Sequence, residues 1–287
     1  MSRTIAMLTD FGTADTYVGV MKGVIQRISP GTQIIDLTHD IAPQGVRLAA
    51  LSLMNNCRYF APGTIFLVVV DPGVGSTRRP IAVEAGDYTF VAPDNGVLSY
   101  VLAQLGAYQA VELGNPAYRL KTVSRTFHGR DIFAPAAAHL AAGVALADLG
   151  GTLETLVRLP VPEITLSGRR VTGEALHIDR FGNVITSIGK LNWISDHRLT
   201  LNPVFNPMLG VMPISPENVV VMTNDHEIAV LHRAYSDVPR GELMALVGSD
   251  GYLELSVNQG NAAQRVDIAV GDRIVVELGE PDAAIRD

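Results

Sequence analysis

Residues 64–70 read TIFLVVV, and residues 71–78 continue DPGVGSTR. The apolar run shows no alternation, which is typical of a strand covered on both faces of a sheet. The polar stretch after it holds a carboxylate, two glycines and an arginine, so the strand ends in a loop. Ligands of open α/β sheets bind beyond the carboxyl ends of the strands. We therefore expect the chemistry of this chain to centre on the loop from Asp71 to Arg78.

Strand-like and helix-like segments alternate around this stretch to about residue 150. We expect strands at residues 5–9, 33–37, 64–70, 80–83 and 89–91, and helices at residues 17–28, 46–55, 96–105 and 133–143. The alternation predicts an α/β N-terminal domain with a layered, mostly parallel sheet.

The pattern changes after Gly150-Gly151. Residues 156–167 read LVRLPVPEITLS, which is punctuated by prolines, lacks helical periodicity and indicates a linker. The remaining segments are short, β-like and separated by turn residues, which predicts an all-β, barrel-like domain. The predicted organisation is an α/β catalytic domain at 1–155, a linker at 156–168 and a β-barrel domain at 169–287.

Composition excludes several classes of protein. Hydrophobic residues make up 47% of the 287 residues and charged residues only 18%, so a large core can be buried. The net charge is −7 without a Lys/Arg tract, which argues against a nucleic-acid or membrane partner. A single cysteine, Cys57, excludes an internal disulfide and is expected to be buried. The N-terminus has no signal-peptide pattern and no apolar run is long enough to span a membrane, so we expect a cytoplasmic protein.

Three loops of the first half share one construction, an apolar strand followed by a carboxylate and a glycine. They contain Asp10-Phe11-Gly12, Asp71-Pro72-Gly73 and Asp94-Asn95-Gly96. Singly, each is most simply a turn, but three together favour a ligand site at one sheet edge. Neither a complete Gly-x-Gly-x-x-Gly nor a Walker lysine is present, so phosphate binding is disfavoured. A strand-end carboxylate suits the vicinal hydroxyls of a ribose, and Asp10 is the best-placed candidate.

Arg78 and Arg79 follow the Asp71 loop. One of them is expected to be a surface charge. The functional alternative is that one turns inward and pairs with Asp71, because seven residues with glycines can fold back far enough. Among seven histidines, His128 is the candidate best surrounded by polar residues, and His39 is its nearest rival. Asp131 is either a helix cap or the partner of Arg130.

Other catalytic patterns are missing. No His-x-His, His-Glu-x-x-His or other closely spaced ligand pair occurs, so we expect no metal. No Gly-x-Ser-x-Gly elbow supports a serine hydrolase. In the second half, residues 177–186 and 247–263 carry polar groups at bends, and each is either a plain hairpin or part of a site.

Taken in order, these segments resemble the S-adenosylmethionine hydroxide adenosyltransferase family, which is related to the fluorinating and chlorinating enzymes that cleave the same molecule. The resemblance covers nearly the whole chain, and its markers are residues 8–12, 70–79, 93–96, 126–135, 178–186 and 235–263. It implies an α/β domain and a β-barrel, hydrolysis of S-adenosylmethionine to adenosine and methionine, and a homotrimer with sites between subunits.

The resemblance also implies roles for individual residues. The catalytic set falls on Asp71, Arg78 and His128. The implied substrate-binding residues are Asp10 at the ribose, Asn183 and the backbone of Ala262 or Ala263 at adenine, Phe181 and Tyr235 packing on adenine, Asp179 and Ser249 at the methionine end, and Phe11, Asn95, Thr126, Phe127 and Gly129 nearby. The turn Asp179-Arg180-Phe181 is one residue shorter than in the fluorinating enzymes, so contacts at this bend are expected to differ.

The implied reaction agrees with the missing metal patterns. A sulfonium leaves as a neutral thioether, so no general acid, cofactor or metal is needed, and S-adenosylmethionine is the substrate. The halogenating relatives have a tyrosine where this chain has Asp71, which favours water over halide as the nucleophile. A halogenase and a non-catalytic adenosine-binding protein are the two alternatives.

Overall fold

The computed structural model describes residues 3–279, so the outer ends of the two predicted domains, residues 1–2 and 280–287, lie outside the described residues. The chain divides after Leu159 into two compact units. This division falls between the predicted boundaries at residues 155 and 168.

The first unit is built on a mixed sheet. Within the described residues it has six strands in the order β2-β1-β3-β5-β4-β6. The strands are β1 Ile5–Thr9, β2 Ile34–Thr38, β3 Ile65–Val69, β4 Pro80–Ala85, β5 Tyr88–Pro93 and β6 Tyr108–Glu112. The first four in this order pair in parallel, whereas β4 is antiparallel to both β5 and β6.

The three consecutive strands expected at residues 64–70, 80–83 and 89–91 are confirmed as β3, β4 and β5. The chain passes from β3 to β4 through the loop at residues 70–79 without a helix, and β4 and β5 then form a hairpin. The physical reason is local: the two residues Gly86-Asp87 form a tight turn, with Gly86 at φ 53°. Strand β6, at an edge of the sheet, was not predicted.

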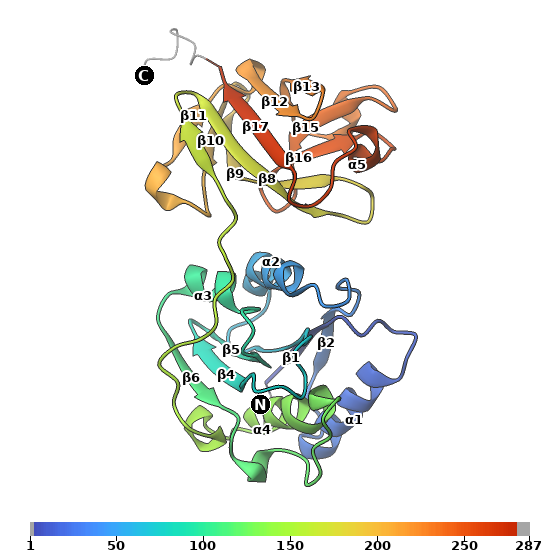
Figure 1. The fold of residues 1–287 in the computed structure, drawn as a ribbon, viewed down its shortest axis with the longest axis vertical. Coiled ribbons are helices and arrows are strands. Elements are labelled where there is room, and N and C mark those ends of the chain that lie inside the picture. The colour runs from blue at the N-terminus through green and yellow to red at the C-terminus, as the bar shows by residue number, and fades with distance from the viewer. Residues whose placement is uncertain (1–2, 280–287) are drawn as a thin grey trace. The chain divides into compact units, whose positions relative to one another are not determined.

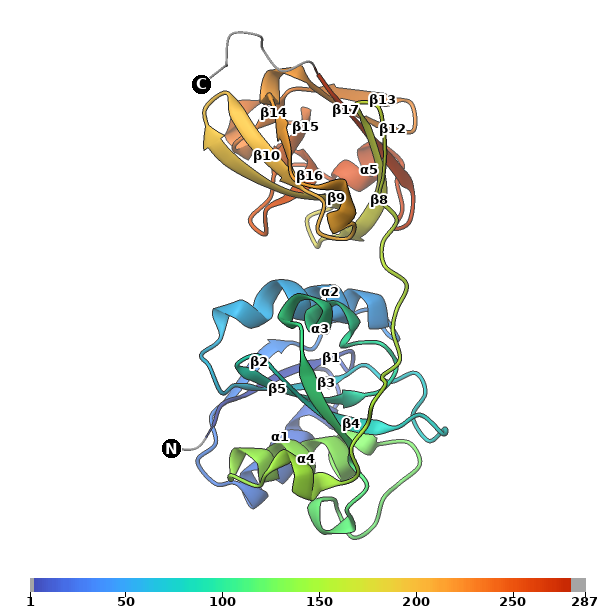
Figure 2. The ribbon, with the colours of Figure 1, turned by 90° about the vertical axis from the view of Figure 1, so that its left-hand side faces the viewer.

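Helices cover both faces of this sheet. Helices α1 Tyr17–Ile28 and α4 Ala134–Ala141 lie on one face, and α2 Val46–Asn56 and α3 Ser99–Leu105 lie on the other (Figures 1 and 2). Helix α1 turns Val18, Met21 and Ile25 into the core, at the spacing that one helical face requires. All five residues of β3 are buried, as expected for a strand covered on both sides.

The parallel strands end at a common edge. Thr9 pairs with Val69 and Leu67 pairs with Val91, so β1, β3 and β5 run in register. The loops that follow them, with Asp10, Asp71 and Asp94, therefore leave the sheet at the same edge, as the sequence predicts.

The second unit is a large, nearly closed barrel-like sheet (Figure 2). Among the described residues it has eleven strands, of which eight follow the order β13-β12-β17-β8-β9-β16-β15-β14 and β7, β10 and β11 attach beside them. The strands are β7 Thr165–Ser167, β8 Arg170–Ile178, β9 Val184–Ser195, β10 Arg198–Asn202, β11 Met212–Ile214, β12 Val219–Thr223, β13 His226–Ala229, β14 Leu231–His232, β15 Leu243–Val247, β16 Tyr252–Val257 and β17 Arg273–Leu278. A short helix, α5 Ala262–Arg265, precedes β17.

The sequence predicts strands of this unit at residues 169–178, 184–186, 219–222, 228–232, 243–247, 252–255 and 273–278, so three of the observed strands were not predicted. Strands β10 and β11 are short and partly polar or proline-containing, yet they pair with each other, and β10 also pairs with β9. Strand β7 lies inside the expected linker and pairs with β8, whereas residues 156–164 carry no helix or strand. Segments with a weak strand pattern of their own thus become strands because they pair with a neighbouring strand.

Candidate functional site

The loop after β3 folds back on itself. The N–H of Val74 donates to the carbonyl of Asp71 at 3.2 Å, and the N–H of Ser76 donates to the carbonyl of Gly73 at 3.1 Å. Gly75 has φ 77°, and a Cβ atom there would lie 2.3 Å from the carbonyl oxygen of Arg125. Only glycine fits this backbone conformation and this close approach. Two consecutive turns therefore return the chain toward Asp71.

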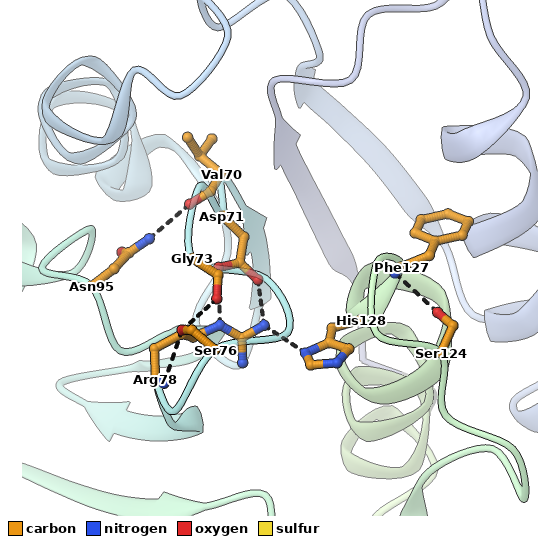
Figure 3. Close-up of polar contacts among 9 residues, drawn as sticks. All are labelled: Val70, Asp71, Gly73, Ser76, Arg78, Asn95, Ser124, Phe127 and His128. Atoms are coloured by element: carbon orange, nitrogen blue, oxygen red, sulfur yellow. Dashed lines mark hydrogen bonds and ion pairs between the residues drawn. The ribbon is translucent and has the colours of Figure 1, made fainter.

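This turn brings Arg78 onto Asp71, so the inward alternative is confirmed. The Nε of Arg78 donates to Oδ1 of Asp71 at 2.9 Å, and its Nη2 donates to Oδ2 (Figure 3). The same Nη2 lies 2.7 Å from Nδ1 of His128, 50 residues further along the chain. The side chains of Arg78 and Asp71 are 9% and 5% exposed. The structure thus joins the three predicted catalytic residues.

These contacts define the protonation state of His128. Arginine only donates hydrogen bonds, so Nδ1 of His128 must accept, and the ring proton of the neutral form lies on Nε2. Burial lowers the pKa of His128, and the Arg78 cation lowers it further, against the opposing effect of Asp71. His128 is therefore neutral at pH 7. Among the described residues, no hydrogen bond from Nη1 of Arg78 is recorded, which leaves that donor for a ligand.

Arg79 points to a different carboxylate. Its Nε donates to Oδ2 of Asp94 at 2.9 Å, and its Nη2 donates to the carbonyl of Thr155 at 2.8 Å. Asn95 donates from Nδ2 to the carbonyl of Val70 at 2.9 Å and accepts from Val97 N–H at 3.2 Å. Asn95 therefore supports the strand end that carries Asp71, and its expected contact with substrate stays a prediction.

His128 stands at the start of a widened helical turn. Residues Gly129–Phe133 form a π-helix, η3, in which the N–H of Ala134 bonds the carbonyl of Gly129, and this turn runs directly into α4. The expected helix at 133–143 is thus shorter and has a π-helical start. Phe133 places its ring 5.1 Å from the guanidinium carbon of Arg78. Such π turns are frequent at functional sites, because the inserted residue redirects the side chains around it.

Asp131 is the partner of Arg130. Its Oδ1 accepts from Arg130 Nε at 2.6 Å and its Oδ2 accepts from Ser124 N–H at 2.8 Å, and the carboxylate is fully buried. No side-chain cap is recorded at this helix start. Asp131 thereby ties the segment before His128 to the π-helix.

The loop after β1 carries the ribose candidate. Oδ2 of Asp10 accepts from the N–H of Gln44 at 2.8 Å, which fixes the carboxylate and leaves Oδ1 for a ligand. Phe11, Tyr17 and Phe127 form an aromatic cluster with ring centroids 5.1 to 6.0 Å apart.

Three further candidate residues of the first unit, Gly129, Thr126 and His39, differ in burial and in the groups they contact. Gly129 packs under the aromatic cluster: a Cβ there would lie 3.2 Å from Phe127 and 3.4 Å from Phe11. Thr126 is exposed. His39, the rival histidine, is buried, and its Nδ1 lies 2.9 Å from the hydroxyl of Thr9. His39 is therefore not part of the Asp71–Arg78–His128 cluster.

A cavity of about 610 Å³ in the second unit collects five of the predicted residues. These five residues line it together: Asp179, Phe181, Asn183, Tyr235 and Ser249. They come from the β8–β9 turn, the segment before β15 and the β15–β16 turn. Residues 177–186 and 247–263, each of which could have been a plain hairpin, thus both contribute to one cavity.

The β8–β9 turn is held by Asp179. Its Oδ1 accepts from the N–H groups of Phe181 at 2.8 Å and Asn183 at 2.9 Å, and its Oδ2 accepts from Nδ2 of Asn183 at 2.9 Å. Phe181 is left 75% exposed at the tip. Ala262 and Ala263 are buried and do not line the cavity, and the N–H of Ala263 already bonds the carbonyl of Gly182 at 2.9 Å.

The sequence analysis missed a charged residue of this cavity. Glu254 lines the cavity, although its side chain belongs to β16, whose six residues are all buried. Its Oε1 accepts from Tyr235 at 2.8 Å and from Ser256 at 2.7 Å. A lone carboxylate inside a mostly apolar strand was the signal in the sequence, since an unpaired buried charge is costly.

The described residues show neither a membrane-spanning helix nor a metal-binding cluster. They contain no helix long and apolar enough to span a membrane. Among them, no group of three or more His, Cys, Asp or Glu side chains is arranged to hold a metal ion. Cys57 is buried, as predicted.

The chain is similar to known proteins over most of its length. Residues 5–150 match the family model of the SAM hydroxide adenosyltransferase N-terminal domain, and residues 173–275 match that of the C-terminal domain. A protein of Salinispora tropica named (R)-S-adenosyl-L-methionine hydrolase is 42% identical, with 96% of this chain and 98% of that protein covered. A protein of the same name from Thermus thermophilus is 36% identical, covering 94% and 97%.

A more distant relative and a solved structure are also similar over nearly the full length of the chain. A fluorinase from Actinoplanes sp. is 27% identical, covering 95% of this chain and 96% of the relative. A crystal structure of an uncharacterized conserved protein from Thermotoga maritima is 39% identical and superimposes with a TM-score of 0.83, covering 95% of this chain and 99% of that one.

Proposed function

The chain belongs to the SAM hydroxide adenosyltransferase family, and from this membership we propose that it hydrolyses S-adenosyl-L-methionine to adenosine and L-methionine. The observation that carries the proposal is the contact of Arg78 with both Asp71 and His128, in which the side chains of Arg78 and Asp71 are almost fully buried. This cluster offers a fixed cation and a carboxylate to one small polar molecule.

The reaction is an in-line displacement at the ribose C5′. An oxygen of water forms a bond to C5′ while the C5′–S bond breaks, and the electron pair leaves with sulfur as a neutral thioether. Bulk water is a weak nucleophile, with a pKa of about 15.7. The free Nη1 of Arg78 stabilises hydroxide character on the water, and preorganised donors of this kind typically contribute about 10²–10³ in rate.

Asp71 serves as anchor and base together. Both of its oxygens hold Arg78, but each carboxylate oxygen keeps a second lone pair that can take the water proton. His128, neutral and accepting from Nη2, orients the guanidinium. Holding water and C5′ in line supplies up to roughly 7–11 kcal/mol of the barrier reduction. No step needs a metal or a further cofactor, since the leaving group requires no proton.

The substrate is held by both units in this proposal. Asp10 binds the ribose hydroxyls, with Phe11, Asn95, Thr126, Phe127 and Gly129 around it. The cavity of the second unit holds adenine and the methionine end through Asn183, Phe181, Tyr235, Asp179 and Ser249, with the backbone of Ala262 or Ala263 near adenine. We propose a cytoplasmic homotrimer, in which the catalytic unit of one subunit works with the barrel unit of its neighbour.

Oxygen-18 water tests the reaction directly. The purified protein, incubated with S-adenosylmethionine in labelled water, should place the label in O5′ of adenosine and release methionine. The Arg78→Ala variant is the matched control and should yield no adenosine above background. Unlabelled adenosine, or stoichiometric binding without turnover, contradicts the proposal. Formation of 5′-halo-adenosine with added chloride or fluoride would instead assign a halide-transferring activity.

A further inference from the structure

Glu254 is the least accessible charged group of the cavity in the second unit. Its side chain is 7% exposed, and both hydrogen bonds recorded to its carboxylate, from Tyr235 and Ser256, end on Oε1. Within the described residues, no hydrogen bond to Oε2 is recorded. That oxygen lies beside the backbone of Gly248, where a Cβ atom would come within 2.5 Å of it. Gly248 precedes Ser249, which also lines the cavity.

The cavity carries negative charge without a basic partner. Asp179 and Glu254 both line it, and its lining residues include neither lysine nor arginine. Burial raises the pKa of Glu254, Ser256 and Tyr235 lower it by hydrogen bonding, and the nearby Asp179 raises it again. A carboxylate held this way becomes more stable when a cation with N–H donors enters the cavity.

Asp179 already accepts several hydrogen bonds within its own turn. It accepts three hydrogen bonds from Phe181 and Asn183, and these hold the bend between β8 and β9 together. Glu254 differs, because the hydrogen bonds recorded to it within the described residues, from Tyr235 and Ser256, both end on Oε1. Of the two carboxylates, Glu254 therefore has the larger free capacity to accept from a ligand.

We propose that Glu254 binds the α-ammonium group of the substrate through Oε2, with Tyr235 and Ser256 holding the carboxylate in position. The assignment rests on the proposed function for the identity of the ligand. An ammonium group brings a positive charge and three N–H donors, whereas a sulfonium has no donor and the 6-amino group of adenine has no charge. Only the ammonium satisfies both needs of a buried carboxylate.

Ligand binding with and without the amino group tests the assignment. Binding is measured by calorimetry in an Arg78→Ala background, so that substrate is not consumed. The ligands are S-adenosylmethionine, its analogue with a hydroxyl in place of the α-amino group, and adenosine. Glu254→Gln should weaken S-adenosylmethionine about 10- to 100-fold, the range expected for a charge-assisted hydrogen bond, and change the other two less than about twofold. Glu227→Gln, at an exposed position of β13, is the matched control and should change none of them.

The assignment is overturned if Glu254→Gln loses affinity equally for all three ligands, or loses affinity for none of them. Should Glu254→Gln not fold, Tyr235→Phe, which removes one donor to Oε1, must still weaken S-adenosylmethionine more than the hydroxy analogue. The proposed function fails separately: a wild-type protein that binds S-adenosylmethionine through Glu254 without releasing labelled adenosine refutes hydrolysis and retains this binding role.

Discussion

Arg78 has two kinds of contact that a different cation would not reproduce. Its planar guanidinium donates to both oxygens of Asp71 and to His128, and it lies over the ring of Phe133. Lysine has a single charged nitrogen and lacks the flat fork. The contacts of Arg78 therefore depend on the planar shape of its guanidinium as much as on its positive charge.

Arg78→Lys should lower kcat/KM by roughly 10²–10³, because the Nη1 donor proposed to stabilise hydroxide character on the water is lost while the charge stays. Steady-state kinetics measure this, and circular dichroism checks the fold. Arg79→Lys is the matched control: it alters the contact with Asp94, outside the catalytic cluster, and should leave kcat/KM within a few-fold. Equal losses in both variants would contradict the assigned role of Arg78.

The activity should fall on acidification with a midpoint below pH 6.5. Burial and Arg78 lower the pKa of His128, so the neutral form needed to accept from Nη2 persists above that lowered pKa and is lost as pH falls through it. The pH dependence of kcat/KM measures this limb. In His128→Asn the limb should move or vanish, and an unchanged profile would show that another group titrates.

At the scale of elements, the site depends on how strands end rather than on the strands themselves. Loop 70–79 uses two turns to reverse direction, and Gly75 passes against the backbone of the segment that leads to His128. The contact between Gly75 and Arg125 thus couples the Arg78 loop to the His128 segment.

Gly75→Ala should destabilise the protein by roughly 2–4 kcal/mol, because the new Cβ meets the Arg125 carbonyl in addition to the strain of a positive φ. It should also lower kcat by displacing the loop. Gly31→Ala is the matched control, with φ 83° and no atom near its Cβ, and should cost about 1 kcal/mol without affecting kcat. Thermal or denaturant unfolding measures both changes, and similar values would refute the close-approach argument.

Much of this arrangement was predictable from the sequence, and the failures share a cause. The strand-end loops of Asp10, Asp71 and Asp94 follow from apolar runs that stop at polar residues. The choice of Arg78 over Arg79 does not, because neighbouring residues of a loop point in directions that only the turns decide. Strands β10 and β11 and the burial of Glu254 likewise depend on partners distant in sequence.

At the scale of the whole molecule, the predicted residues fall into two groups. Asp71, Arg78 and His128 belong to the first unit, and the cavity residues belong to the second. Each unit has a buried core of its own. The homotrimer proposed above would combine one group from the first unit of one subunit with the other group from the second unit of its neighbour.

Mixing two inactive variants tests that arrangement. Arg78→Ala should inactivate the proposed catalytic cluster of the first unit, and Asp179→Ala should disable the proposed substrate cavity of the second. The two variants are unfolded together and reassembled at equal amounts into a trimer. A site is then complete only where the intact first unit of an Asp179→Ala subunit meets the intact second unit of an Arg78→Ala subunit, so about one quarter of the sites should recover. Sedimentation should give about 92 kDa, three times the 30.7 kDa of one chain. No recovery in a verified trimer would place each site within one subunit.

The π turn from Gly129 to Phe133 has a consequence for insertions and deletions. It holds one residue more than an ordinary helical turn, and each residue of an α-helix rotates the chain by about 100°. Removing a single residue here would leave an unbroken helix that swings His128 about a quarter-turn away from Arg78. This segment can therefore accept substitutions far more readily than a change in its length, and homologous chains without the extra residue would have to find another partner for the arginine.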